Sequence, residues 1–308
     1  MKKYLLLALL PLTAMAAPSL KGFEKTYQDW DLICDNTGTC NMAGYPEYYS
    51  EHPVSILFTR SAGEQAPVTA QLALLPDELG NKTAEIILNG QSLGTIQNFS
   101  EEGNAKLSEK QTTELLTALK GNASIEVILG EFKEKVSDKG AAAAMLKMDE
   151  FQQRLNTPSA LIRQGQEKHA VLAPKVEPKI DAVSVNNRKT IELKHGEKQF
   201  NHVLALLRKA HDGCVDEDLE SQDITLYPLT QNKVLAEALC ARAAYQYTNY
   251  YAVLDDKLSK VEQVLAEQYN EAGYDEKQGY AFVRGAYKGR GAGDCWSIQD
   301  AVWNGKIF

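Results

Sequence analysis

The sequence predicts an α+β protein, with an N-terminal antiparallel β-sandwich-like domain that carries appended helices and a C-terminal mixed α+β domain. The first half of the chain contains short β-branched or aromatic runs bounded by Gly, Pro, Asn or Asp, a pattern typical of strands. Two segments with apolar residues at helical spacing follow in the same half. A charged, proline-containing segment without periodicity then separates this half from a second series of strand and helix patterns.

The strands of the first half are predicted by four runs, Phe23–Cys34, Val54–Arg60, Val68–Leu75 and Ala84–Leu88. We expect them to pair antiparallel. Asn89-Gly90 follows the last run and precedes a further short apolar segment. Both turn residues tolerate a positive φ, so this pair predicts a two-residue type I′ hairpin.

The first helix is predicted by its start and stop signals. Ser108 followed by Gln111 forms a capping box, and Gly121 is the expected end. The apolar face of this helix consists of Leu115, Leu116 and Leu119.

A strand over Ile125–Leu129 and a second helix over Ala141–Leu155 complete the first domain. The apolar residues that recur at helical spacing in the second helix are Met145, Met148, Phe151 and Leu155.

Residues 164–185 are expected to link two domains, because they are charged and contain Pro174 and Pro178 without clear periodicity. The predicted organisation is a signal peptide over residues 1–16, a β-sandwich-like domain over 17–163, this linker, and an α+β domain over 186–308.

The C-terminal domain is predicted to mix helices and strands. An amphipathic helix is expected at Lys198–Ala210, and a strand at Ile224–Leu229 that runs into a helix through Cys240. The following expected elements are an aromatic strand at Tyr245–Leu254, a helix around Leu258–Tyr269, a strand at Tyr280–Val283 and a second Asn-Gly hairpin within Val302–Phe308.

The N-terminus has the three parts of a signal peptide. Lys2 and Lys3 precede the apolar run Tyr4–Leu12, and Ala14-Met15-Ala16 supplies a small-x-small cleavage site. We expect cleavage after Ala16 and export to the periplasm. The first cysteine is Cys34, so a lipid anchor is not expected.

The charge balance argues against two classes of partner. Loss of Lys2 and Lys3 with the signal peptide moves the formal net charge from −8 to −10. A surface this acidic repels phosphate backbones and anionic lipid. No later apolar run approaches the roughly 20 residues that span a bilayer. We therefore expect no nucleic-acid partner and no membrane insertion.

The five cysteines, Cys34, Cys40, Cys214, Cys240 and Cys295, predict disulfides in an oxidising compartment. Cys34 and Cys40 enclose a turn-rich loop and are expected to pair. Cys214 is expected to pair with Cys240 or Cys295, and the spacing does not choose between them. A zinc site is the weaker alternative, because the chain lacks a C-x-x-C motif and a supporting His cluster. We predict no metal and no cofactor.

The sharpest candidate site is the segment from Arg284 to Trp296, which is rich in glycine and cations. Glycines allow close approach of the backbone to a ligand, and arginines with a lysine could clamp a phosphate or carboxylate. A tight turn with Asp294 bound to backbone amides and Cys295 in a disulfide would give the same pattern. The candidate ligand-binding residues are Arg284, Lys288, Arg290, Asp294 and Trp296.

A second candidate is the aromatic cluster Tyr45, Tyr48 and Tyr49, with Pro46 and His52 nearby. Exposed rings here could hold a glycan or a partner protein, and a loop covering one end of a sandwich would look the same. No G-x-S-x-G or H-E-x-x-H motif marks a catalytic centre. We therefore predict no catalytic residue.

Several segments resemble the exported proteobacterial family known as domain of unknown function 1176. The segments that carry the resemblance are Trp30–Asp35, Gly38–Cys40, Leu146–Glu150, Thr157–Leu161, Gly289–Cys295 and Trp303–Gly305. The N-terminal half is also similar to the invasion-associated locus B family through its Trp-x-x-x-Cys opening, which implies a β-sandwich-like domain. The chain departs from the first family's pattern at Trp296 and Asn304. This resemblance implies architecture and compartment, and no activity.

The sequence as a whole favours a periplasmic binding or protein-interaction module of the cell envelope, with a protein or a glycan as partner. The alternative is an envelope hydrolase whose catalytic site is assembled only by the fold. A purely structural envelope protein is the third possibility.

Overall fold

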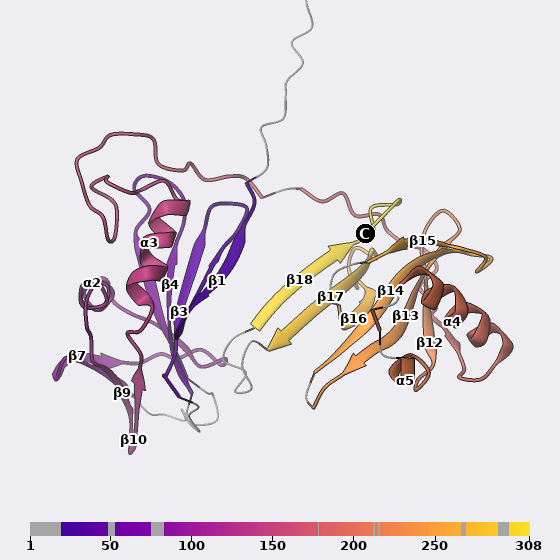
Figure 1. The fold of residues 1–308 in the computed structure, drawn as a ribbon, viewed down its shortest axis with the longest axis horizontal. Helices are drawn as coiled ribbons and strands as arrows, with labels where there is room; N and C mark the ends of the chain where they lie inside the picture. Colours follow the sequence, from indigo (N-terminus) through magenta and orange to yellow (C-terminus); the bar gives the residue numbers. More distant parts are fainter. Residues whose placement is uncertain are drawn as a thin grey trace, which may run out of the picture. The chain divides into compact units, whose positions relative to one another are not determined.

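The computed structural model describes residues 20–48, 53–74, 83–177, 179–211, 213–214, 216–244, 246–265, 269–288 and 296–308. The predicted signal peptide, residues 1–16, lies outside the described residues. The chain divides into two compact units, Met1–Glu177 (unit 1) and Pro178–Phe308 (unit 2). Antiparallel sheets predominate in both units and a few helices accompany them (Figure 1). The predicted α+β class is therefore confirmed, with β-structure as the main component.

Unit 1 contains a six-stranded antiparallel sheet with the order β1-β2-β3-β4-β5-β8. Its strands are β1 (Phe23–Tyr27), β2 (Trp30–Cys34), β3 (Cys40–Gly44), β4 (Val54–Arg60), β5 (Val68–Leu74) and β8 (Asn104–Lys106). The run Phe23–Cys34 is not one strand as predicted but a hairpin, because Gln28 adopts a φ of 54° and reverses the chain between Tyr27 and Trp30.

A four-stranded antiparallel sheet with the order β10-β9-β6-β7 completes the β-structure of unit 1. Its strands are β6 (Ala84–Leu88), β7 (Gln91–Ile96), β9 (Ile125–Leu129) and β10 (Phe132–Val136). The predicted Asn89-Gly90 hairpin is confirmed: the φ angles are 49° and 82°, and Leu88 pairs with Gln91.

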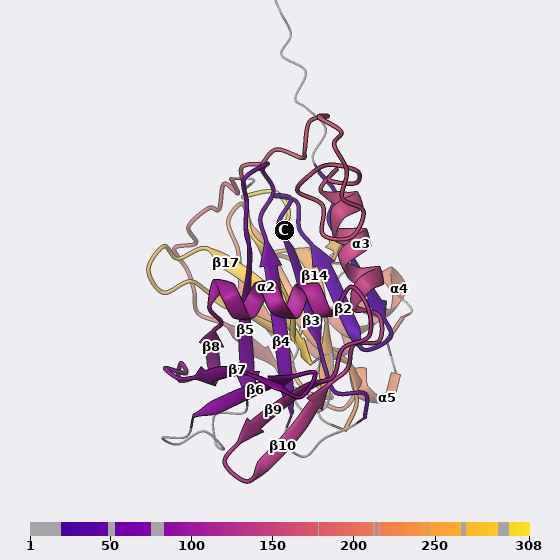
Figure 2. The same cartoon turned by 90° about the vertical axis from the view of Figure 1, so that its left-hand side faces the viewer.

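Two helices pack on the six-stranded sheet. Helix α2 (Glu109–Ala118) begins with the predicted capping box, in which Ser108 and Gln111 bond each other reciprocally. Helix α3 (Ala141–Phe151) is shorter than predicted, because Gln153 adopts a φ of 56° and ends the helix before Leu155. Figure 2 shows α2 lying across β3, β4 and β5, and the four-stranded sheet running across the six-stranded one.

One hydrophobic core joins both sheets and both helices of unit 1. Inward side chains such as Trp30, Ile56 and Ile86 are fully buried, while alternate residues of the same strands are partly exposed. Gly140 begins α3 with a φ of 99° where the chain passes over β1. A Cβ at Gly140 would lie 1.8 Å from the Tyr27 carbonyl oxygen, so only glycine fits this crossing.

The segment predicted as a linker, residues 164–185, is hydrogen-bonded to each unit in turn. The Leu172 amide donates to the Gln152 carbonyl and the Lys175 amide to the Thr37 carbonyl, both in unit 1. The Val183 amide donates to the Trp303 carbonyl in unit 2. The predicted domain limits stay predictions.

Unit 2 contains a five-stranded antiparallel sheet with the order β11-β12-β13-β14-β15. Its strands are β11 (Ile191–Leu193), β12 (Ile224–Pro228), β13 (Lys233–Arg242), β14 (Tyr247–Asp255) and β15 (Val261–Val264). The helices of this unit are α4 (Lys198–Ala210), which was predicted, and the short α5 (Asp216–Leu219).

Two helix predictions in unit 2 are wrong. The segment after Leu229, predicted to be helical through Cys240, is strand β13. The stretch around Leu258–Tyr269, also predicted as a helix, contains strand β15. Strand β13 is buried on both faces, since Val234 and Ala236 pack in the α4 core and Leu235 packs in a second core. Burial on both faces removes the alternation that identifies a strand in a sequence.

A three-stranded antiparallel sheet with the order β16-β17-β18 forms the other layer of unit 2. Its strands are β16 (Glu271–Tyr274), β17 (Ala281–Lys288) and β18 (Trp296–Val302). The inward residues Ala281 and Val283 share a core with Tyr251 of β14 and with Trp303. Residues 303–308 form a turn and no strand, so the predicted C-terminal hairpin is wrong. The Asn304 side chain closes that turn by accepting hydrogen bonds from the Lys306 and Ile307 amides.

Two disulfides are present among the described residues. Cys34–Cys40 joins β2 to β3 as predicted. Cys214–Cys240 ties the segment after α4 to β13 and decides the pairing that the sequence left open. The alternative pairing of Cys214 with Cys295 is therefore wrong, and Cys295 itself lies outside the described residues.

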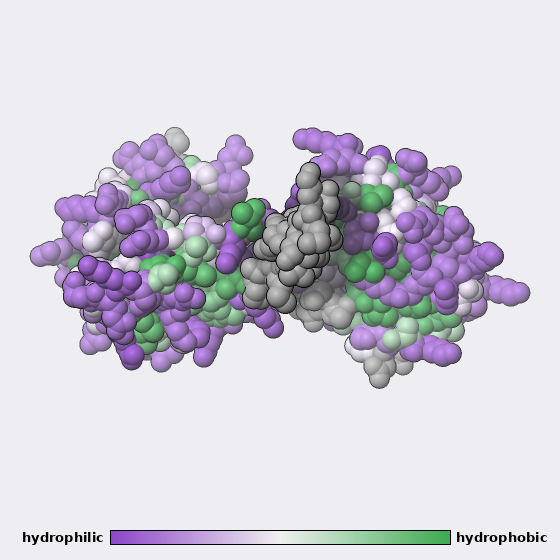
Figure 3. Space-filling model, turned by 90° about the horizontal axis from the view of Figure 1, so that it is seen from above, coloured by the Kyte–Doolittle hydropathy of each residue, from purple (hydrophilic) through white to green (hydrophobic). Residues whose placement is uncertain are grey.

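The described helices include none that is long and apolar enough to cross a membrane. On the face that Figure 3 presents, hydrophilic residues predominate and hydrophobic residues gather in smaller patches.

Candidate functional site

The structure brings three of the five predicted ligand-binding residues together. Arg284 and Lys288 lie on β17, and Trp296 begins β18 directly opposite Lys288. Side chains two residues apart on a strand share a face of the sheet, so all three lie on one side of it. Arg290 and Asp294, in the connection between the two strands, are outside the described residues.

This side of the sheet, named the Trp296 face, points away from the core of unit 2. Its members are Phe282, Arg284, Ala286 and Lys288 on β17 and Trp296, Ile298, Asp300 and Val302 on β18. Trp296 is 47% exposed and Ile298 is 66% exposed. Two large apolar side chains therefore lie exposed side by side on β18, the edge strand of its sheet.

The two described cations of the Trp296 face differ in their surroundings. Arg284 makes a bidentate ion pair with Asp300, with N–O distances of 2.8 and 2.9 Å. That ion pair raises the pKa of Arg284 above its ordinary value. The Lys288 ammonium lies 5.5 Å from the centre of the Trp296 ring, and none of the ion pairs among the described residues involves it. Lys288 is thus the described cation best placed to meet an added anionic group.

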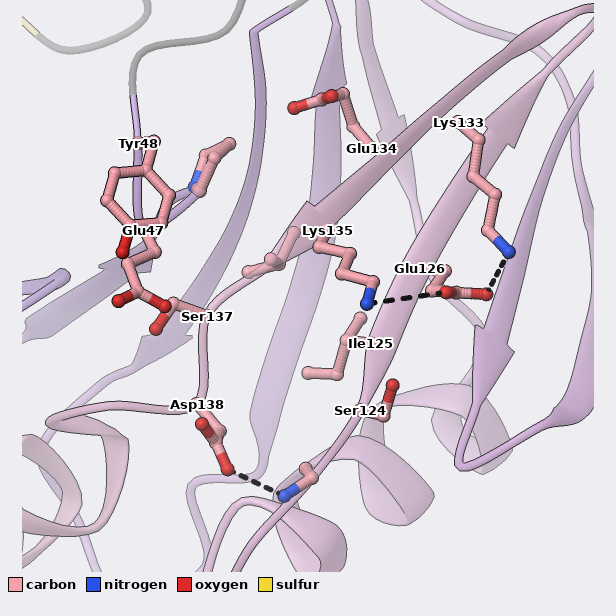
Figure 4. Close-up of a pocket in the computed structure, with 13 residues that line it drawn as sticks. Glu47, Tyr48, Ser124, Ile125, Glu126, Lys133, Glu134, Lys135, Ser137 and Asp138 are labelled. Atoms are coloured by element: carbon pink, nitrogen blue, oxygen red, sulfur yellow. Dashed lines mark hydrogen bonds and ion pairs between the residues drawn. The ribbon is translucent and has the colours of Figure 1, made fainter.

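Unit 1 carries a wide groove between the loop at residues 46–48 and strands β9 and β10, with a volume of about 840 Å³. Figure 4 shows Glu47 and Tyr48 on one side of this groove and Glu126 with two lysines on the other. Glu126 lies 2.6 Å from Lys133 and 3.9 Å from Lys135. The single carboxylate of Glu126 therefore pairs with both lysines.

The structure divides the predicted aromatic cluster. Tyr48 is 76% exposed beside the groove, whereas Tyr45 is 4% exposed and belongs to the buried residues of unit 1. Tyr49 and His52 lie outside the described residues. Glu47 pairs with Lys139, and this hydrogen bond lowers the pKa of the Glu47 carboxyl. A patch that includes an exposed Tyr45 is excluded.

Unit 2 contains a second cavity, named the polar pocket, of about 460 Å³. It lies at the turn end of the β13–β14 hairpin. It is on the face of the five-stranded sheet that carries Leu235 and Tyr251, which pack against β17 farther along the same strands. The lining residues that bear on its chemistry are Asp223, Thr225, Glu237, Arg242, Tyr247 and Asn249.

The Glu237 carboxyl of the polar pocket is held in place by side chains of the neighbouring strands. Its carboxylate accepts hydrogen bonds from the Tyr227 hydroxyl at 2.5 Å, from the Tyr251 hydroxyl at 3.2 Å and from the Asn249 amide. Burial raises the pKa of Glu237, although these three hydrogen bonds oppose the shift. Tyr251 is 1% exposed and belongs to the core. Its hydrogen bond therefore reaches Glu237 from the core, while the opposite side of Glu237 lines the pocket.

The part of the chain that the structure describes contains no group of three or more His, Cys, Asp or Glu side chains arranged to hold a metal ion.

The comparison with protein families gives one match over most of the chain. The sequence profile described as "Protein of unknown function (DUF1176)" matches residues 24–308. The chain belongs to the DUF1176 family. Searches of curated proteins and of solved structures found no match. The similarity to the invasion-associated locus B family stays a prediction.

Two of the segments that carry the resemblance to the DUF1176 family meet at a buried charge cluster in unit 1. Asp149 is fully buried, lies 3.5 Å from the Arg60 guanidinium, and accepts hydrogen bonds from the Leu161 and Ile162 amides. The Arg154 guanidinium, also fully buried, donates to the Gly63 carbonyl and to the Ser159 hydroxyl. These contacts tie the chain after α3 to Arg60 of β4 and to Gly63, so we expect their role to be structural.

Sequence reasoning missed the polar pocket. Glu237 lies on a segment predicted to be helical, and its partners Tyr227 and Tyr251 come from other strands. The aromatic strand predicted at Tyr245–Leu254 was the one available signal, and its pairing with β13 could not be inferred from it.

Proposed function

We propose that the protein is an exported, periplasmic binding module of the cell envelope that holds a partner protein on the Trp296 face. The observation that carries the proposal is the exposure of Trp296 (47%) beside Ile298 (66%). Exposed apolar side chains that adjoin each other favour an interaction site over an ordinary solvated surface.

The chemistry of the Trp296 face suggests what the partner offers. An apolar segment would cover Trp296 and Ile298, and a carboxylate next to that segment would meet Lys288. Arg290 and Asp294, in the adjoining connection, complete the proposed site. Arg284 contributes less in this proposal, because Asp300 already satisfies its guanidinium.

Export is supported by the N-terminal sequence and by the two disulfides, which persist mainly in oxidising compartments. We expect the mature protein to begin at Ala17. Mass spectrometry of the protein released from the periplasm by osmotic shock measures this, and retention of residues 1–16 would contradict it.

The partner is tested by in-cell cross-linking of the tagged, exported protein and mass spectrometry of what it captures. Ile298→Asp and Lys288→Glu each place a negative charge on the Trp296 face, and both are expected to lose the captured protein. Tyr48→Ala is the matched control, since Tyr48 is 76% exposed in unit 1. Capture that is equal in all forms, or no capture by the wild type, would overturn the proposal.

One observation favours the alternative of an envelope hydrolase. Glu237 lines a pocket, and burial raises the pKa of its carboxyl, as is common for catalytic acids. Release of soluble fragments from purified cell walls by the wild type, and its loss in Glu237→Gln, would support that alternative.

A further inference from the structure

We propose that the polar pocket of unit 2 binds a neutral saccharide, with the Tyr247 ring against the sugar face and with Glu237 and Asn249 as hydrogen-bonding groups. The pocket has a volume of about 460 Å³. Sites for small ligands commonly measure about 300–1,000 Å³. No described residue of this pocket's lining belongs to the Trp296 face, so the variants of one site leave the side chains of the other unchanged.

The first argument is the exposed aromatic ring. Tyr247 begins β14, is 48% exposed and lines the pocket. A tyrosine ring offers a flat apolar surface of fixed shape, which suits the C–H groups on one side of a pyranose. Tyr247 also lies opposite Arg242 in the β13–β14 ladder, so the backbone holds both residues at the same end of the pocket.

The second argument is a hydrogen-bond acceptor that is fixed in position before any ligand arrives. Oε1 of Glu237 accepts from Asn249 and Tyr251, and Oε2 accepts from Tyr227. A carboxylate oxygen has two lone pairs, so Oε2 keeps one acceptor position for a hydroxyl donor. Asn249 uses its amide nitrogen in these contacts, and none of the hydrogen bonds among the described residues uses its Oδ1.

The third argument is that the lining mixes donors and acceptors. The Thr225 hydroxyl and the Arg242 guanidinium add donors to the acceptors of Glu237 and Asn249. Sugar hydroxyls donate and accept at once, so they match such a lining better than a purely apolar or purely anionic group does. Asp223 also lines the pocket but is paired with Lys194 at 2.8 Å, so the negative charge of Glu237 is the one that disfavours a phosphate.

The experiment titrates the purified mature protein with chitotriose, cellotriose and maltotriose in turn. Saturation-transfer NMR and calorimetry measure the binding. We expect one of these neutral sugars to bind. Tyr247→Ala should weaken that binding at least about tenfold, which corresponds to about 1.4 kcal/mol. Tyr247→Phe should bind as the wild type does, because it keeps the ring. Glu237→Gln should also weaken binding, although the Tyr247 ring is unchanged.

The controls separate this site from the other surfaces. Ile298→Asp on the Trp296 face and Glu150→Ala on α3 of unit 1 should bind the sugar unchanged. Inorganic phosphate serves as the anionic comparison. Failure of all three sugars to bind, binding that survives Tyr247→Ala, or phosphate binding that Arg242→Ala abolishes would each overturn the proposal. Since Tyr247 is 48% exposed, its variants test the proposal even where Glu237→Gln does not fold.

Discussion

Each unit of the chain takes a carboxyl group out of solvent, fully for Asp149 in unit 1 and partly for Glu237 in unit 2, and the surroundings of the two groups differ. In unit 1, Asp149 is fully buried against Arg60, with Arg154 nearby, and accepts hydrogen bonds from two backbone amides. In unit 2, Glu237 has only uncharged donors around it, from two tyrosines and an asparagine, and lines a pocket. Burial raises the pKa of both carboxyls.

This difference links the surroundings of each carboxyl to the role that it can have. Oδ2 of Asp149 accepts from two backbone amides and Oδ1 faces the Arg60 guanidinium at 3.5 Å, so that group holds a chain segment in place. Uncharged donors fix the orientation of the Glu237 carboxylate but do not use all of its lone pairs. Oε2 therefore keeps an acceptor position toward the pocket. The comparison predicts a structural role for the first carboxyl and a binding role for the second.

The largest effect is expected from Asp149→Ala. Removal of this carboxylate leaves Arg60 and Arg154 without their buried counter-charge and leaves two amides without an acceptor. Breaking a buried ion pair in this way costs about 3–5 kcal/mol of unfolding free energy. Guanidinium denaturation, with hydrogen exchange to follow unit 1 separately, measures the loss.

Glu150→Ala is the matched control for that variant, because Glu150 is the next residue on the same helix. It forms an exposed ion pair with Lys147 at 3.1 Å. Pairs of this kind contribute about 0–1 kcal/mol. Equal losses in the two variants would remove the contrast between a buried and a surface carboxylate.

A smaller effect is expected from the buried tyrosines of unit 2 in alkali. Burial raises the pKa of Tyr250 from 10.0 to about 12. The neutral hydroxyl is then favoured in the folded state, so the free energy of unfolding falls as the pH rises from about 10 to about 12. The fall for this residue amounts to about 1.4 kcal/mol per pH unit. Hydrogen exchange of unit 2 against pH measures it.

Tyr250→Phe should remove that part of the alkaline destabilisation. The Tyr250 hydroxyl makes one hydrogen bond among the described residues, a 3.4 Å contact to the Leu207 carbonyl, so the variant should fold. An unchanged pH dependence in Tyr250→Phe would contradict the prediction.

The smallest effect is expected from Glu237→Gln, at neutral pH about 1 kcal/mol or less, because an amide keeps one acceptor and carries no buried charge. The raised pKa of Glu237 means that its contribution to stability is fully present below about 4.5 and is lost as the pH rises through the folded-state pKa. Glu237→Gln should flatten this part of the pH profile of unit 2. A loss of several kcal/mol at neutral pH would instead give Glu237 the same structural role as Asp149.

Local signals in the sequence were sufficient for several elements. The Asn89-Gly90 turn, the Ser108–Gln111 capping box and the Cys34–Cys40 disulfide were each predicted and are each present. Each of these features depends on residues within a few positions of one another, where the turn and capping preferences of single side chains decide the backbone.

The candidate site was predictable only in part. The sequence drew attention to Arg284, Lys288 and Trp296, and the antiparallel pairing of β17 with β18 puts them on one face. It gave no sign that Asp300, sixteen residues after Arg284, would bind that guanidinium. The exposure of Ile298 likewise depends on which face of β18 meets the core.

The residues alone were enough to predict the α+β class and the Asn89-Gly90 turn, because short-range preferences fix these, and the family, because several segments resemble it. The second Asn-Gly hairpin, predicted in the same way, was wrong. Only the folded structure shows that Cys214 pairs with Cys240, that the segment around Cys240 is a strand, and that Tyr227, Asn249 and Tyr251 meet at Glu237. These outcomes depend on strand pairing between distant segments and on burial of β13 from both sides, and neither leaves a periodic signal in the residues themselves.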